Sequence, residues 1–211
     1  MMPGMLARRM VVYGDLNCPF CYALEERLVA RKVQPNVEWR LVEHAPHLPL
    51  EPAGAKPGEL EELVRELEDL SERAPDVIIG PPRFRPNSGL AIQAVAEGLA
   101  IDPRRAGTLR LLLFRALWRE GKNIADPNVV AELMDHAGLP PPHGTAEAAA
   151  TAARWTLEWR DARFERIPVM ISDVGTKLLG LTPPRRLDLF LASGLFSESS
   201  ELACDVEDEG R

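Results

Sequence analysis

Cys18-Pro19-Phe20-Cys21 places two cysteines three positions apart, directly after a short apolar run. That run, Val11 to Tyr13, predicts a buried strand, and residues 14–17 predict the turn that leaves it. Leu24 and Leu28 recur at helical spacing from Cys21, which predicts a helix. The cysteine pair is therefore expected where a strand passes into a helix. The charged residues of this helix are expected mostly on its other face: Glu25, Glu26, Arg27, Arg31 and Lys32.

A cysteine at the start of a helix is chemically special. The first turn favours an anion, because its backbone N–H groups lack internal partners and carry partial positive charge. The pKa of a thiol placed there falls from about 8.5 to between roughly 3.5 and 7.5. Pro19 suits the first helical position, since its φ is fixed and its missing N–H would be unpaired. We interpret Cys18 as an attacking thiolate and Cys21, one turn further on, as the resolving thiol.

The composition is that of a globular protein with one good core: 211 residues, 45% hydrophobic and 27% charged. A net charge of −7 argues against nucleic acid or an acidic membrane as the main partner. Residues 1–10 lack an apolar run of signal-peptide length, and no later stretch is long enough to span a bilayer. We expect a cytoplasmic protein, in which a C-x-x-C pair is more often catalytic or metal-binding than structural.

The remaining pattern predicts strands at both ends of the chain and helices between them. Alternation of Val37, Trp39 and Leu41 with polar residues predicts a second strand over 37–42. Apolar periodicity and Asp-Pro starts predict helices over 58–73, 88–100, 103–120, 127–137 and 145–163. Strands over 168–171 and 176–179 and a helix over 183–191 follow.

This order of elements predicts an α/β protein, a thioredoxin fold with a large all-helical insertion. The thioredoxin-like domain is expected to be discontinuous, over 8–57 and 164–195. The inserted helical domain is expected over 58–163, and residues 196–211 form an acidic C-terminal tail.

The chain resembles the DsbA-like thioredoxin family, and within it the cytoplasmic branch of FrnE-type oxidoreductases and 2-hydroxychromene-2-carboxylate isomerases. The resemblance covers most of residues 10–193. It is carried by residues 15–22 around the cysteines, 85–88 with Ala91, 120–127 with Gly138-Leu139, and Ile167-Pro168.

The resemblance implies roles for the residues around the cysteines. Pro168 would be a cis-proline packed against the disulfide, and Ile167 would offer main-chain hydrogen bonds to an extended substrate. Physical chemistry agrees, because X–Pro is the common cis site and proline places no N–H beside the sulfurs. Pro19 and Phe20 join them as predicted substrate-binding residues. Arg166 stands where relatives commonly have glycine, and would add positive charge near Cys18.

Several of these features have a structural alternative. A cysteine pair can be half of a zinc site, but Cys204 and the histidines show no regular ligand spacing, so no metal is expected. Pro168 read alone fits a trans proline that begins an edge strand. His44 and His47 are expected to be exposed in a proline-rich loop, with a substrate role as the alternative. Asp15 either accepts protons from the thiols or ends the strand and helps to cap the helix.

Other candidate residues are expected to be structural. Trp155 and Trp159, one turn apart, predict core packing rather than a groove. Asn87 and Ser88 are expected to cap a helix, and Cys204 to be a free thiol. A solvated face, rather than an anion-binding one, is expected for Arg160, Arg163 and Arg166.

The leading functional hypothesis is a thiol–disulfide oxidoreductase that acts on a disulfide-containing protein or a small thiol substrate. It needs no cofactor beyond its own redox-active disulfide, with glutathione as a candidate electron donor. The alternative is a glutathione-dependent isomerase or kappa-like transferase, in which one of the two cysteine positions is typically serine. A third hypothesis is a non-catalytic binding module, which predicts that Cys18→Ser leaves partner binding intact.

Overall fold

The computed structural model describes residues 10–54, 56, 58–80 and 82–193, and its sheet has the strand order β2-β1-β3-β4. Strand β1 (Met10–Gly14) is parallel to β2 (Val37–Leu41) and antiparallel to β3 (Val169–Ile171). Strand β4 (Lys177–Leu179) is antiparallel to β3. Helices connect the two halves of this mixed sheet, so the predicted α/β class is confirmed.

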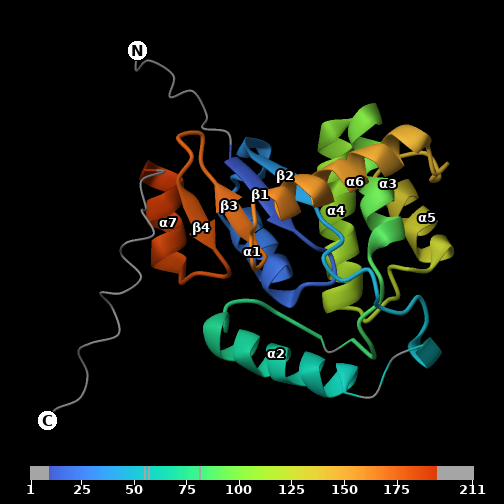
Figure 1. Cartoon of the computed structure of the whole chain (residues 1–211), viewed down its shortest axis with the longest axis horizontal. Coiled ribbons are helices and arrows are strands. Elements are labelled where there is room, and N and C mark those ends of the chain that lie inside the picture. The colour runs from blue at the N-terminus through green and yellow to red at the C-terminus, as the bar shows by residue number, and fades with distance from the viewer. Residues whose placement is uncertain (1–9, 55, 57, 81, 194–211) are drawn as a thin grey trace, which may run out of the picture.

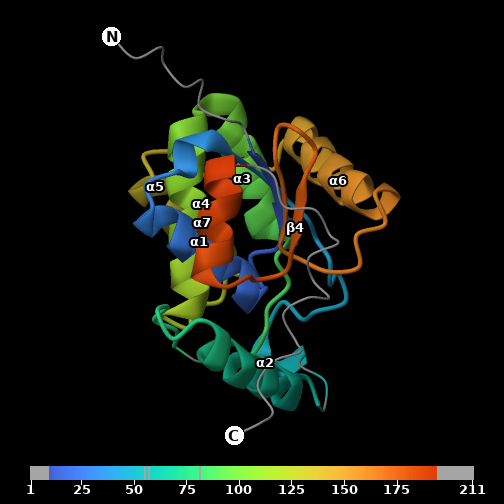
Figure 2. The same ribbon diagram turned by 90° about the vertical axis from the view of Figure 1, so that its left-hand side faces the viewer.

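Helices cover both faces of the sheet. Helices α1 (Pro19–Ala30) and α7 (Pro184–Ser193) lie on one side of it, and α6 (Ala146–Asp161) lies on the other (Figure 2). Beyond the β2 edge, α3 (Gly89–Ile101) packs against both α6 and α4 (Pro103–Trp118) (Figure 1). Helix α5 (Pro127–His136) packs on α3 and α4, and single turns of 3-10 helix occupy Gln34–Asn36 and Pro52–Gly54. Each predicted strand and helix is present, within about three residues of its predicted ends.

Helix α2 (Glu59–Arg73) lies apart from the α3–α6 group, below the end of the sheet, and contacts α1 (Figures 1 and 2). Its predicted apolar stripe is only partly buried. Leu63 and Leu70 are each 1% exposed, whereas Leu60 and Val64 are 51% and 46% exposed. The helix sits at the periphery, so only one edge of the stripe reaches the core.

The charged residues of α1 correct a second prediction, because Glu25 and Arg27 are buried rather than facing solvent. Arg27 donates two hydrogen bonds to the Asp76 carboxylate, at 3.0 and 2.7 Å, and others to backbone oxygens of Arg73 and Thr182. These bonds satisfy a buried guanidinium, and together with the Arg27 charge they lower the pKa of Asp76. Arg27 therefore ties α1 to the end of α2 and to the segment before α7.

Candidate active site

Three chain segments meet at one end of the sheet. The parallel strands β1 and β2 both end there, and the antiparallel strand β3 begins there. The residues just outside these strand ends are 15–18, 42–44 and 167–168. Cys18, His44 and Pro168, which are far apart in sequence, are thus placed at the same end of the sheet. The Ile167–Pro168 peptide bond is cis, as the resemblance implies, and the Pro168 carbonyl accepts a hydrogen bond from Gly180 N–H at 2.8 Å.

Cys18 is the N-cap of α1. Its backbone is extended (φ −101°, ψ 118°), and Pro19 is the first helical residue. The Sγ of Cys18 accepts a hydrogen bond from Cys21 N–H at 3.4 Å. Both cysteines are free thiols, 6% and 0% exposed. The predicted placement of the pair at the strand-to-helix junction is confirmed. One of the unpaired N–H groups of the first turn therefore points at the Cys18 sulfur.

The two thiols ionise in opposite directions from an ordinary cysteine. Burial opposes ionisation of Cys18, but hydrogen bonds from Cys21 and the charge of His44 outweigh it, so the pKa of Cys18 is lowered. Burial is also the largest effect on Cys21, and there the hydrogen bond to Cys18 and the Cys18 charge add to it, so the pKa of Cys21 is raised well above its ordinary value. Cys18 is therefore the thiol that ionises first, and Cys21 the one that stays protonated.

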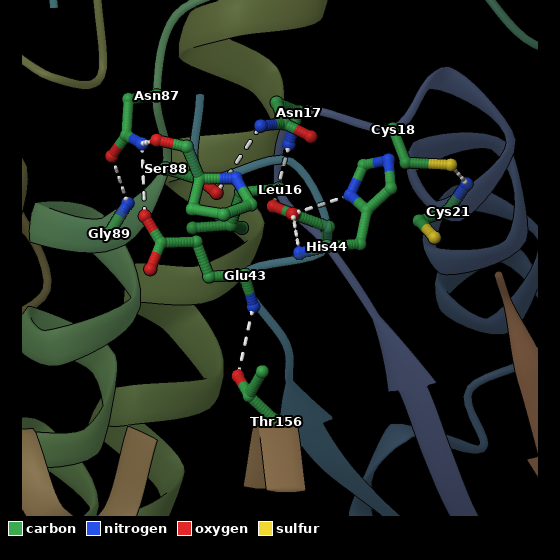
Figure 3. Close-up of polar contacts among 12 residues, drawn as sticks. Leu16, Asn17, Cys18, Cys21, Glu43, His44, Asn87, Ser88, Gly89 and Thr156 are labelled. Carbon is green, nitrogen blue, oxygen red and sulfur yellow. Dashed lines mark hydrogen bonds and ion pairs between the residues drawn. The ribbon is translucent and has the colours of Figure 1, made fainter. Parts of the chain in front are cut away.

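His44 is a site residue, and the prediction that it is exposed in its loop is wrong. Its Nδ1 lies 2.7 Å from Oδ2 of Asp15, and its backbone N–H donates to the same oxygen at 3.0 Å. The His44 side chain is 27% exposed, whereas Asp15 is completely buried. The free edge of the His44 ring faces Cys18 (Figure 3). His47 lies on the surface, as predicted.

Asp15 acts on His44 and not as a helix cap. It follows β1 directly, but the cap of α1 is Cys18, and the second Asp15 oxygen accepts a 3.3 Å hydrogen bond from the backbone N–H of Asn17. Burial would lower the pKa of His44, but its hydrogen bond to Asp15 and the charges of Asp15 and Cys18 raise it, against an opposing effect of Arg85. Asp15 therefore favours a protonated imidazole beside the Cys18 sulfur.

A hydrogen-bond network fixes the loop that carries Cys18 (Figure 3). Asn17 Nδ2 donates to the Ser88 hydroxyl and to the Pro86 carbonyl, both at 3.3 Å. Ser88 stands at the N-cap of α3, but its side chain forms no capping bond, so the capping role falls to Asn87, whose Oδ1 accepts from the N–H of the first helical residue at 2.8 Å. The indole N–H of Trp118 donates to the backbone carbonyl of Leu16 at 2.8 Å. Both α3 and α4 thus hold the cysteine loop.

The remaining candidates lie further from the sulfurs or in the core. Phe20 is partly buried, with the Arg73 guanidinium 5.3 Å from its ring centre. The charged groups that act most strongly on Cys18 are His44 and Asp15, not Arg166. Trp155 is buried in the core and Trp159 packs against it, partly buried, so the predicted core packing is confirmed. Arg160, at the end of α6, and Arg163 and Arg166 after it are exposed, as predicted, and the last two line a pocket with Lys177.

Among residues 10–54, 56, 58–80 and 82–193, no three His, Cys, Asp or Glu side chains are grouped to hold a metal ion. None of the helices described above combines the length and apolar character needed to cross a bilayer.

Residues 9–155 match the model of the DSBA-like thioredoxin domain. The chain belongs to this family. Proteins of the DSBA-like thioredoxin family are thiol–disulfide oxidoreductases, so the enzyme class predicted from the cysteine pair is confirmed. The sequence matches none of the curated proteins with which it was compared.

Solved structures agree with the family. A probable DsbA oxidoreductase from Streptomyces coelicolor has a TM-score of 0.66 at 17% identity, covering 90% of this chain and 92% of that one. The cytosolic disulfide reductase DsbM from Pseudomonas aeruginosa scores 0.65 at 19% identity over 88% and 98% of the chains, and was also solved with GSH. A periplasmic thioredoxin-like protein from Salmonella enterica serovar Typhimurium scores 0.55 at 16% identity over 88% and 83%. This likeness establishes a DsbA-like thioredoxin fold with a helical insertion.

Proposed function

We propose that this protein exchanges thiols and disulfides through Cys18 as the attacking thiolate and Cys21 as the resolving thiol. The Cys18 thiolate attacks one sulfur of a substrate disulfide, and the other sulfur leaves as a thiolate that takes up a proton. The Cys21 thiol then loses its proton and attacks Cys18, which releases the second substrate sulfur. Two electrons pass from the cysteine pair to the substrate, and the same steps in reverse oxidise a dithiol.

The hydrogen bond from Cys21 N–H to Cys18 Sγ is the observation that carries this proposal. It places an unsatisfied helix N–H on the sulfur that must hold a negative charge. The opposite pKa directions of the two thiols fit the same assignment, since the nucleophile has to ionise while the resolving thiol stays neutral until the mixed disulfide forms.

We propose Pro19, Phe20, Ile167 and Pro168 as the surface that receives the substrate chain. Support comes from their position at the sheet end where the β1–α1 loop and the start of β3 meet. Pro168 brings no N–H to the sulfurs, and the backbone of Ile167 is then the next group able to pair with an extended peptide.

We propose a cytoplasmic reductase of disulfide proteins or small disulfides, placed in the branch with FrnE-type oxidoreductases, and reduced by glutathione. One structural neighbour is described as a cytosolic disulfide reductase and was solved with GSH. The presence of cysteine at both Cys18 and Cys21 speaks against the glutathione-dependent isomerase, in which a resolving thiol is not needed.

Trapping of the mixed disulfide tests the assignment of roles. We would treat reduced Cys21→Ser and Cys18→Ser, both in a Cys204→Ser background, with glutathione disulfide and measure intact mass. Cys21→Ser should accumulate one glutathione on Cys18, because nothing resolves it. Cys18→Ser should stay unmodified at neutral pH, because Cys21 is buried and remains protonated. Equal modification of the two variants would overturn the assignment.

A further inference from the structure

The loop after β2 brings a histidine to the cysteine site, and a buried carboxylate holds it there. His44 is bound twice by one oxygen of Asp15, through its Nδ1 at 2.7 Å and its backbone N–H at 3.0 Å. The backbone bond fixes the position of the residue, and the ring bond fixes the orientation of the imidazole. With Nδ1 engaged, the opposite edge of the ring is left facing Cys18 (Figure 3).

The Asp15 carboxylate has little else to stabilise its charge. It is completely buried, and besides its contacts with His44 it accepts a hydrogen bond from the N–H of Asn17 at 3.3 Å. An ionised carboxylate in such a place needs a cation, because burial without a charged partner is costly. The imidazolium of His44 lies within hydrogen-bond distance of this carboxylate, and its charge also acts on the Cys18 sulfur that has to ionise.

We propose that Asp15 and His44 are positioning residues for thiol–disulfide exchange: Asp15 holds His44 as a cation, and this cation stabilises the Cys18 thiolate. The proposal rests on the proposed function and assigns two residues to its attacking step. It also balances charge during the reaction. When Cys18 enters the mixed disulfide its negative charge disappears, His44 releases a proton, and the departing substrate thiolate takes one up.

The charged groups that act on His44 come from three segments. Asp15 from the β1–α1 loop and Cys18 at the start of α1 favour its charged form. Arg85, from the segment before α3, opposes it, but its guanidinium is paired with the carboxylate of Glu66 on α2. The balance of these charges therefore favours the imidazolium while Cys18 is ionised.

The rate at which iodoacetamide alkylates reduced Cys18 tests this proposal without requiring turnover. Rates would be followed from pH 5 to 10 by mass spectrometry of the Cys18 peptide, in His44→Asn and in the matched control His47→Asn. His44→Asn should react about tenfold more slowly at pH 6, the effect of one pKa unit, and reach the wild-type rate at pH 10. His47→Asn should follow the wild type throughout. An unchanged profile in His44→Asn overturns the proposal. If His44→Asn slows alkylation as expected but the wild-type protein exchanges no disulfide, the proposed function is wrong instead.

The sign of the Asp15→Asn effect separates positioning from simple repulsion. Asp15 acting through His44 predicts slower alkylation of Cys18 at pH 6, because the histidine loses the carboxylate that keeps it charged. Asp15 acting only as a negative charge near Cys18 predicts faster alkylation. In the His44→Asn background the same change should therefore become accelerating, and an accelerating effect in both backgrounds would overturn the proposal.

A measurement on the unmutated chain covers the case in which a variant fails to fold. The sequence has four histidines, so the ring signals can be resolved by NMR and titrated before and after Cys18 is alkylated. The pKa of His44 should fall on alkylation, because the thiolate that favours its charge is gone. A His44 titration that is the same in both forms contradicts the proposal.

Discussion

A methyl group at Gly14 has no room beneath the cysteine pair. The Cβ of Gly14→Ala would lie 2.7 Å from Cζ3 of Trp39 and 3.0 Å from Sγ of Cys21. Gly14 is the last residue of β1, and both neighbours are buried in the layer between the sheet and the helices, where Trp39 also packs edge-on to Phe114 at 5.7 Å. The substitution therefore forces either the indole or the resolving sulfur to move.

The size of the effect follows from the overlap. Unbonded carbons make their best contact at about 3.5–4.0 Å, so Trp39 would have to shift by roughly 0.8 Å or more. Overpacking of this kind in a well-packed core costs about 1–3 kcal/mol. For a chain of this length, a loss of about 2 kcal/mol lowers the melting temperature by roughly 4–8 °C. Displacement of the Cys21 sulfur should also slow the resolving step.

Urea denaturation of the reduced protein measures the stability, and the lifetime of the mixed disulfide with glutathione measures the resolving step. The matched control is Gly107→Ala in α4, where an added Cβ meets nothing within 4 Å. That change should stabilise the protein by about 0.5–1 kcal/mol, because glycine inside a helix is unfavourable. A Gly14→Ala protein as stable as the wild type, with normal resolution, would refute the close packing described for Cys21.

Three further substitutions probe other parts of the site. Arg110→Met removes the guanidinium that lies 2.9 Å from the buried Glu25 carboxylate, and the unfolding free energy measured in urea should fall by about 3–5 kcal/mol. A second change, Glu25→Gln, should restore most of this free energy. A loss under 1 kcal/mol in Arg110→Met would contradict the role of the ion pair. Trp118→Phe deletes the indole bond to the cysteine loop and should cost about 1–3 kcal/mol, with a Cys18 alkylation rate that departs from the wild type. In reduced Cys21→Ser, the pKa of Cys18 should be lower in the folded state than its unfolded value of about 8.5. The unfolding free energy should therefore be highest above about pH 8.5 and should decline as the pH falls from there through the folded-state pKa of Cys18. An unfolding free energy that does not change over this pH range would argue against the lowered pKa.

Features that depend on neighbouring residues could be predicted from the sequence. The N-cap position of Cys18 could be predicted because an apolar run, a proline and a helical repeat all lie within about fifteen residues of it. The Asp-Pro starts of two central helices are confirmed, since Asp102 and Asp126 both accept hydrogen bonds from N–H groups of the first turn. Alternation likewise predicted β2, whose buried positions are Val37, Trp39 and Leu41.

Features that depend on tertiary contacts could not be predicted from the sequence. Asp15 and His44 are 29 positions apart, and only the parallel pairing of β1 with β2 brings their loops together. A proline-rich loop carries no signal that one of its histidines is held and the next is exposed. Glu25 belongs to a charged run that is typical of a solvated helix face, and its partner Arg110 lies 85 positions away on α4. The buried ion pair depends on the packing of α1 on α4, which no local pattern in the sequence indicates.

The most direct test of the account is the redox equilibrium of the Cys18–Cys21 pair. The protein would be equilibrated in glutathione buffers of graded poise, and its free thiols trapped and counted, with Cys204→Ser as the background. We expect one reversible two-electron couple between the thioredoxin and DsbA values, about −270 to −120 mV. A pair that forms no reversible disulfide at any poise would contradict it, because neither cysteine could then serve as nucleophile and resolving thiol.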